Sequence, residues 1–176
     1  MGLLMPNWVY NRVSLHAPTE KLQDFYDTLC VQDGDGEPVF SFQAIIPRPT
    51  EEDENWYNWN SINWGTKWDA GDGWAELDKD FLSISFDTAW SPPVPIFLEI
   101  AAACHEHGIG LTCSFEEEQG WGGEWELNPD GTWSKDEWDI PNSHADYAER
   151  DKTCHCEIWE EEETWFSDCP RKGVTV

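Results

Sequence analysis

Between positions 7 and 118, hydrophobic residues recur at every second position in some segments and at helical spacing in others. The order of these segments along the chain constrains the fold more than any single motif. A spacing of two, typical of strands, covers residues 7–18, 39–47, 81–87 and 111–118. Helical spacing covers residues 19–30, behind a Thr19 cap, and residues 91–108, where Gly108 is placed to end the helix. The sequence therefore predicts the order strand, helix, strand, strand, helix, strand.

This β-α-β-β-α-β order is that of a ferredoxin-like α+β fold, with both helices on one face of an antiparallel sheet. We predict a ferredoxin-like domain over residues 1–123, with a long tryptophan-rich insertion at 48–80. Residues 124–176 are expected to form an acidic, β-rich C-terminal extension that packs on this domain. Within the extension, "NPDG" at 128–131 predicts a hairpin turn, 142–150 one or two helical turns, and 153–165 a further strand.

The net charge limits the partners of such a domain. The chain has 36 acidic and 10 basic residues, a formal net charge of −26. It should repel nucleic acid and anionic membranes, and attract basic proteins or cations. Solubility alone is the alternative explanation of this charge. No apolar run suggests a signal peptide or a membrane span, so we expect a cytoplasmic protein whose six cysteines are reduced.

Tryptophan is concentrated in residues 63–74, "NWGTKWDAGDGW". Such rings stack nucleobases in single-strand-binding proteins, but there they lie beside basic side chains. Residues 51–80 hold nine acids and only Lys67 and Lys79 as bases, which argues against nucleic-acid binding. We therefore predict that these rings fold over the open face of the sheet, and that Lys67 pairs with Asp69 or Asp87. The rings concerned are Trp56, Trp59, Trp64, Trp68 and Trp74.

No motif for a cofactor, metal or catalytic nucleophile is convincing, and we predict none of them. "CHEH" (104–107) and "CHC" (154–156), with Cys169, lack the spacing of a zinc site, and "DGDGE" (33–37) lacks that of an EF-hand. Cys113 could be paired with His16 or His105, but it lies on the inward face of its strand. A small buried side chain is the expected role.

Three short runs, "MPNWVYNRV", "NWGTKWDA" and "FDTAWSPP", resemble the phage- and plasmid-encoded proteins with a YubB-type ferredoxin-like domain. The resemblance covers about residues 5–123 and ends near "GWGG". It implies an origin in a bacterial mobile element and the same fold. It implies no reaction and no catalytic residues.

Acidic residues dominate the second half of the chain. Residues 114–168 contain eighteen acids against Lys135, Arg150 and Lys152. Alternate acids on a strand lie about 7 Å apart on one face, which is close to the phosphate spacing along one DNA strand. We predict that this surface binds a partner through Glu116, Glu117, Glu118, Trp159, Glu160, Glu161, Glu162 and Glu163.

The sequence-based hypothesis is a non-enzymatic, nucleic-acid-mimicking inhibitor from a mobile element, acting in the host bacterial cytoplasm. Its partner would be a basic, nucleic-acid-binding host protein, such as a defence nuclease or a CRISPR-type effector. The alternative is a small ligand-binding domain or enzyme with a pocket under the tryptophan-rich loop, where Lys67, Asp87 and His16 would supply polar groups. A structural or regulatory protein with incidental acidity is a third possibility.

Overall fold

The structure, a computed structural model, describes residues 6–32 and 38–149. The chain divides into two compact units, Met1–Trp138 and Asp139–Val176. In the second unit, helix α4 (His144–Glu149) lies within the segment expected to form helical turns. Its start is held by Ser143, whose Oγ accepts a hydrogen bond from the Asp146 N–H at 3.1 Å.

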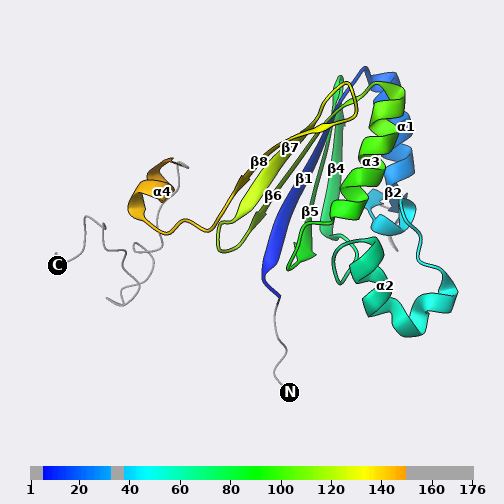
Figure 1. The fold of residues 1–176 in the computed structure, drawn as a ribbon. Coiled ribbons are helices and arrows are strands. Elements are labelled where there is room, and N and C mark those ends of the chain that lie inside the picture. Colours follow the sequence, from blue (N-terminus) through cyan, green and yellow to red (C-terminus); the bar gives the residue numbers. More distant parts are fainter. Residues whose placement is uncertain (1–5, 33–37, 150–176) are drawn as a thin grey trace. The chain divides into compact units, whose positions relative to one another are not determined.

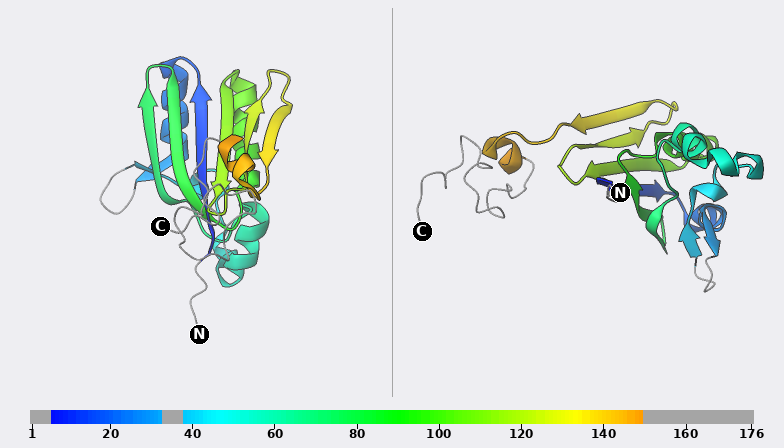
Figure 2. Two further views of the ribbon diagram at one scale, coloured as in Figure 1. Left: turned by 90° about the vertical axis from the view of Figure 1, so that its left-hand side faces the viewer. Right: turned by 90° about the horizontal axis from the view of Figure 1, so that it is seen from below.

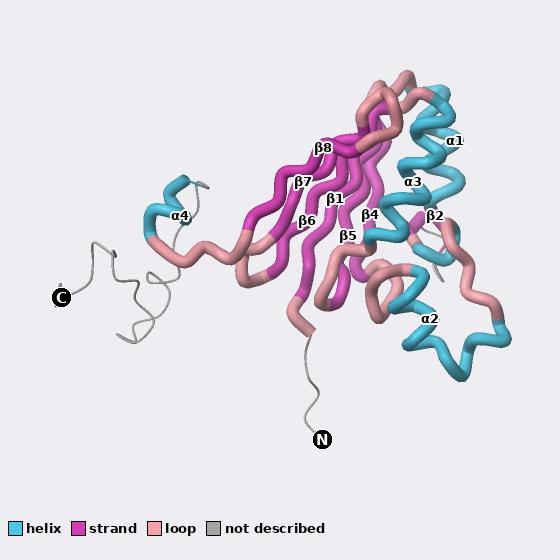
Figure 3. The backbone as a smooth tube through the Cα atoms, in the orientation of Figure 1, coloured by secondary structure: helices cyan, strands magenta, loops and turns pink. Residues whose placement is uncertain are grey.

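The first unit contains a six-stranded sheet, and every strand pairing in that sheet is antiparallel (Figures 1 and 3). In spatial order its strands are β4 (Gly71–Asp78), β5 (Phe81–Ala89), β1 (Trp8–His16), β6 (Gly110–Glu117), β7 (Gly122–Leu127) and β8 (Trp133–Trp138). The mixed α and β content and the antiparallel sheet agree with the predicted fold class. The hairpin expected around residues 128–131 is confirmed, because β7 pairs with β8 on either side of that turn.

Helices α1 (Thr19–Leu29) and α3 (Val94–His107) lie on the same face of this sheet (Figure 2). Strand alternation directs Val9, Val13 and Leu15 of β1 toward the helices, and all three are fully buried. Gly108 ends α3 in the left-handed conformation, as expected, whereas the residue before α1 is Pro18 and the expected Thr19 cap makes no capping bond. Within the first unit, neither α1 nor α3 lies on the opposite face of the sheet, which we call the open face.

The strand predicted at residues 39–47 is wrong for most of its length. Only β3 (Pro38–Phe40) is extended, and it pairs with β2 (Cys30–Gln32) in a separate two-stranded sheet. The chain then turns into a 3-10 helix, η1 (Phe42–Ala44). Asp69 causes the turn, because its carboxylate accepts hydrogen bonds from the Ser41 hydroxyl at 2.7 Å and the Phe42 N–H at 2.6 Å.

The segment 48–80, predicted as a long tryptophan-rich insertion, contains regular elements. These are the 3-10 helix η2 (Thr50–Asn55), helix α2 (Trp56–Asn63) and strand β4, which is the neighbour of β5 in the sheet. The hydrophobic side of β4 is small, with Gly73, Ala75 and Leu77 facing the helices and Trp74 and three acids facing away. Because the inward residues of β4 are mostly small, the hydrophobic alternation of this segment is weak, and the sequence did not predict a strand here.

The prediction that the tryptophans of this segment cover the open face of the sheet is wrong for Trp59 and Trp64, whereas Trp74, opposite Ser85, does point to that face. Trp64 is 1% exposed and lies in the core on the helix side, against Phe42 and Trp59. Phe42 in turn contacts Phe86 of β5, with ring centroids 5.5 Å apart. The loop therefore closes one end of the helix-side core, because the buried strand residues offer the apolar surface that an indole needs.

Tryptophans beyond residue 120 extend the same core, as predicted for this part of the chain. Trp125 is 5% exposed and contacts Phe97 of α3 and Phe115 of β6, while Trp121 and Trp133 pack against the same cluster. Trp159, Trp165 and the strand expected at 153–165 lie outside the described residues. Among the described residues, no helix has both the length and the apolar character that a membrane crossing requires.

Candidate functional site

The sheet face opposite α1 and α3 carries a row of carboxylates. Residues that lie opposite each other in an antiparallel pair point to the same face. Tyr10 lies opposite Asp87 on one side and Glu116 on the other, so these three share the open face. The acids placed there by the register, which we call the acidic face, are Glu76, Asp78, Asp87, Glu116, Glu124, Glu126 and Asp136. All of them are at least partly exposed.

Few positive charges balance this face within the described part of the chain. Arg12 lies near its centre, where its Nε donates a hydrogen bond to Ser83 Oγ at 3.0 Å. His16 lies at the far end of β1, opposite Phe81. Lys135 of β8 lies on the other side, where its ammonium is 3.4 Å from the centre of the Trp125 ring. The acidic face therefore keeps a large negative excess that attracts cationic groups.

A shallow groove of about 410 Å³ crosses the middle of the acidic face. Its side-chain lining includes Tyr10, Arg12, Ser85, Asp87, Ser114, Glu116 and Trp138. Partial burial raises the pKa of the Asp87 carboxyl, and the negative charge of Asp72 raises this pKa further. Burial also raises the pKa of the Tyr10 hydroxyl, with smaller contributions from Glu118 and Asp87. Both pKa shifts come chiefly from burial, and the neighbouring acids add to them.

An aromatic cluster lies at the Trp8 end of the acidic face. The Trp68 ring stacks on Trp90, with centroids 6.0 Å apart, and lies 6.1 Å from Trp8. Tyr57, Trp68 and Trp90 are all exposed. We call Trp8, Tyr57, Trp68 and Trp90 the aromatic patch. Exposed aromatic rings beside a charged surface are typical of protein-binding hot spots.

Lys67 does not form the predicted ion pair with Asp69 or Asp87. Its ammonium lies 4.4 Å from the Trp68 ring centre, 5.3 Å from Trp90 and 5.5 Å from Tyr57. Asp69 is already used, because its carboxylate accepts hydrogen bonds from the Ser41 hydroxyl and from the N–H groups of Phe42 and Ala70. The rings therefore replace a carboxylate as the partner of this cation.

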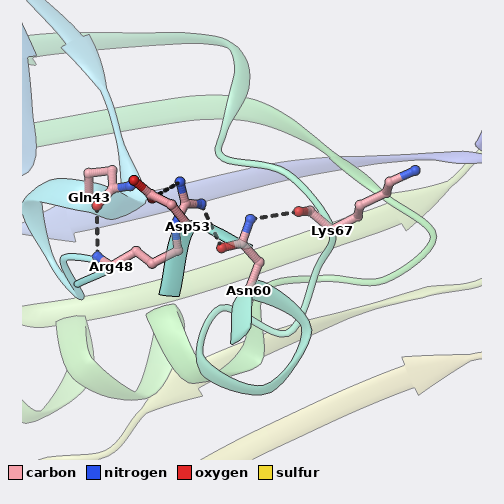
Figure 4. Close-up of polar contacts among 5 residues, drawn as sticks. All are labelled: Gln43, Arg48, Asp53, Asn60 and Lys67. Carbon is pink, nitrogen blue, oxygen red and sulfur yellow. Dashed lines mark hydrogen bonds and ion pairs between the residues drawn. The ribbon is translucent and has the colours of Figure 1, made fainter. Parts of the chain in front are cut away.

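A polar network fixes the backbone that carries Lys67 (Figure 4). Asn60, which is 2% exposed, accepts a hydrogen bond from Arg48 at 3.1 Å and donates one to the Lys67 carbonyl at 2.8 Å. Arg48 also pairs with Asp53 at 3.3 Å, and its backbone N–H donates to Gln43. The Lys67 side chain extends away from this network, so its backbone is held while its ammonium is left to the rings.

Comparison with known proteins identifies the family. The family described as "Ferredoxin-like domain in Api92-like protein" matches residues 63–165, more than half of the chain. The chain belongs to this family. Among solved structures, the crystal structure of the protein api92 from Yersinia pseudotuberculosis is similar, with a TM-score of 0.56 and 11% sequence identity. The match covers 78% of this chain and 99% of that one. At this identity the likeness concerns the fold alone, and no curated protein matches the chain in sequence.

In this Api92-like domain the predicted partner-binding residues separate into different surroundings. Glu116 lies on the acidic face, and Glu118 follows β6, exposed, with its N–H bonded to the Trp8 carbonyl at 3.1 Å. Glu117 is only 2% exposed, and its carboxylate accepts a hydrogen bond from the Gln119 N–H. The alternation of β6 turns it inward, so it is not available to a partner. Trp159 and Glu160–Glu163 lie outside the described residues.

The polar groups of the alternative pocket are not brought together in the Api92-like domain. His16 and Tyr10, the neighbour of Asp87, lie six residues apart on β1, about 20 Å at the rise of a strand. Lys67 lies against the aromatic patch, at the Trp8 end of the acidic face. A different groove, of about 430 Å³, lies between α1 and α3, with mostly apolar walls such as Phe25 and Ile100.

The described residues contain no cluster of metal ligands, and two of their cysteines are buried in the core. Within residues 6–32 and 38–149, no group of three His, Cys, Asp or Glu side chains is arranged to hold a metal ion. Cys104 and Cys113 are fully buried, and burial raises the pKa of the Cys104 thiol to about 12 and that of Cys113 as well. Cys113 is therefore a core residue, as expected. The segments 33–37 and 154–156 and Cys169 lie outside the described residues.

These thiols lead to a prediction about alkylation. The pKa of Cys104 is about 12, so near pH 8 about one in ten thousand Cys104 side chains of the folded chain is a thiolate. We therefore expect iodoacetamide to modify Cys30 well before Cys104 or Cys113. Because the folded pKa of Cys104 lies above its ordinary value of 9.0, the contribution of this thiol to stability is present below pH 9 and is lost as the pH rises toward 12.

Site-resolved mass spectrometry, with and without denaturant, measures the rates. Modification of Cys104 in the native protein as fast as in denaturant would contradict its burial.

Proposed function

We propose that this protein is an interaction protein that binds a basic, nucleic-acid-binding protein through the acidic face. The observation that carries the proposal is the open sheet face itself, where acids from β4, β5, β6, β7 and β8 project with few basic residues between them. Solubility requires charge but no particular placement of it. Here the charge lies on the sheet face opposite α1 and α3, next to an exposed aromatic patch. Acids speed association with a basic partner, and aromatic anchors hold it.

We propose further that the acidic face mimics a nucleic acid. Glu124 and Glu126 are both exposed on β7 and two residues apart, which places them about 7 Å apart on one face. This spacing is close to that of phosphates along one DNA strand. The same argument applies to Glu76 and Asp78 on β4. Such a face suits the phosphate-binding groove of a nuclease or of a CRISPR-type effector, and the protein would block that groove without catalysing a reaction.

Three finer assignments belong to the same proposal. We propose that β1, α1, β4, β5, α3 and β6 constitute a βαββαβ core, to which β7 and β8 add an acidic extension. We also propose an origin in a phage or plasmid with a YubB-type domain, and action in the host cytoplasm. The acids of residues 157–163, which lie outside the described residues, would also bind the partner.

Charge reversal on one sheet face provides the test. Glu124→Lys with Glu126→Lys should slow association with the partner about tenfold at low salt, and the difference should shrink at high salt. The matched control reverses Asp27 and Glu106, which are exposed in the last turns of α1 and α3, where lysine suits the helix dipole. The two double variants have the same net charge, so only the position of the charge differs.

The measurement has two parts. Proteins from a bacterial host lysate are captured on the wild-type chain and on both variants, and each captured protein is then assayed for nucleic-acid binding with and without the chain. The proposal is supported if the wild type and the α1/α3 control abolish that binding and the β7 variant does not. Equal capture by all three chains, or capture of proteins whose nucleic-acid binding is unchanged, would refute it.

A further inference from the structure

The surroundings of Lys67 form a cation-binding cage rather than a simple surface contact. The rings of Tyr57, Trp68 and Trp90 all lie within 5.5 Å of its ammonium, measured to the ring centres. Cages of this kind bind ammonium and methylated ammonium groups through the negative faces of the rings. Among the described residues the ion pair within 4.0 Å is Arg48–Asp53, so no carboxylate shares this cation.

Hydrogen bonds from both sides organise the cage in advance. Thr66, which is 3% exposed, donates through its hydroxyl to the Ala89 carbonyl at 3.0 Å and accepts from the Ala89 N–H at 3.2 Å. Ser91 donates to the Gly65 carbonyl at 2.6 Å. These bonds tie Gly65 and Thr66 to Ala89 and Ser91 without using the Lys67 side chain, so we expect Trp68 and Trp90 to stay in place when that side chain is removed.

Trp90 holds an unusual backbone conformation that presents its ring to the cage. Its φ is 67°, in the left-handed region, which is unfavourable for a bulky residue. The Trp90 N–H donates to the Asn7 carbonyl at 2.9 Å, and this bond secures the conformation. The ring is 40% exposed and stacks on Trp68 instead of entering the core. Strained residues at a surface often mark a binding site.

We propose that the cage of Tyr57, Trp68 and Trp90 is a binding site for an alkylammonium group, and that Lys67 occupies it in the free chain. The occupant that the proposed function implies is a lysine side chain of the basic partner, methylated or not, which displaces Lys67 on binding. This step rests on the proposed function, whereas the cage's affinity for a small ammonium ion does not.

Removal of Lys67 should open the cage to a small probe. We expect Lys67→Ala to bind tetramethylammonium about tenfold more tightly than the wild type, because three rings lose their internal cation. Binding is measured by NMR titration that follows the indole N–H signals of Trp68 and Trp90. The control is Lys135→Ala, which frees one ring, that of Trp125, and should leave tetramethylammonium binding unchanged.

A second variant distinguishes loss of the cage from loss of the fold. Glycine tolerates the left-handed backbone of position 90, so Lys67→Ala with Trp90→Gly should fold and lose the added affinity. If Lys67→Ala binds the probe no better than the wild type or than this double variant, the cage proposal is wrong. Because the probe is a small ion, this result is separate from capture of a basic protein. Tight probe binding without any captured protein would uphold the cage and refute the proposed function.

Discussion

Replacement of Trp64 by alanine is expected to destabilise the fold by about 3–5 kcal/mol, the range for large aromatic residues in a core. The Trp64 ring is 1% exposed and contacts both Phe42 and Trp59 edge to face. Its indole N–H donates to the Ile46 carbonyl at 2.9 Å, and the Arg48 guanidinium lies 5.9 Å above its ring. Alanine would leave a cavity and deprive the Ile46 carbonyl of its donor, so both effects add.

Urea unfolding followed by far-UV circular dichroism measures this change without relying on tryptophan fluorescence. The matched control is Trp74→Ala. Trp74 lies in β4 and is 49% exposed, so its loss should change the free energy of unfolding by less than about 1 kcal/mol. Equal effects of the two substitutions would show that Trp64 does not contribute to the core as described.

Gly122→Ala is expected to cost about 3 kcal/mol, at the upper end of the range for overpacking. A Cβ at this position would lie 2.3 Å from the Phe115 carbonyl oxygen and 3.1 Å from the Glu116 Cα, and both are backbone atoms of β6. Neither atom can move without disturbing the pairing of β6 with β7. The substitution should therefore loosen the β7–β8 hairpin from the rest of the sheet as well as lower global stability.

Hydrogen exchange of the β7 amides, together with urea unfolding, measures both effects. Gly110→Ala is the control, because Gly110 lies in β6 of the same sheet, and its nearest atoms to an added Cβ are those of His16 at 3.5 Å, an ordinary contact. We expect that variant to be close to the wild type in both measurements. Faster exchange confined to the β7 and β8 amides of Gly122→Ala would locate the effect at the predicted clash.

The sequence predicted those elements whose stability comes from their own hydrophobic pattern. β1, β5, β6 and the two long helices have one side of well-spaced large residues, such as Leu82, Ile84 and Phe86. It failed where a distant residue decides the local structure. The apolar run after residue 38 bends into η1 because Asp69, 27 positions further along the chain, binds the Phe42 N–H. No local pattern indicates such a partner.

The density of acids led to the prediction that Glu116 binds a partner. The structure places Glu116 on the acidic face, and its binding of a partner stays a prediction. Its neighbour Glu117 was misassigned because the density of acids does not tell which face of a strand each acid occupies. The alternation of β6 indicates that Glu117 faces inward, opposite Val9 of β1. The cage was missed because it depends on Thr66 and Ala89, which bring Lys67 to Trp90 across 23 positions of sequence. A composition-based argument assigns a lysine to the nearest carboxylate instead.

The position of β4 at one edge of the sheet affects how copies of the chain meet at high concentration. An edge strand offers unpaired backbone groups to which another strand can add, the first step toward fibrils. Two chains that paired along β4 would bring Glu76 and Asp78 of each close to their counterparts, with strands about 4.8 Å apart. The irregular register between Gly71 and Trp74 also disrupts a continuous ladder. Salt or acid would weaken the repulsion, so aggregation along this edge should depend on ionic strength and pH more than on temperature.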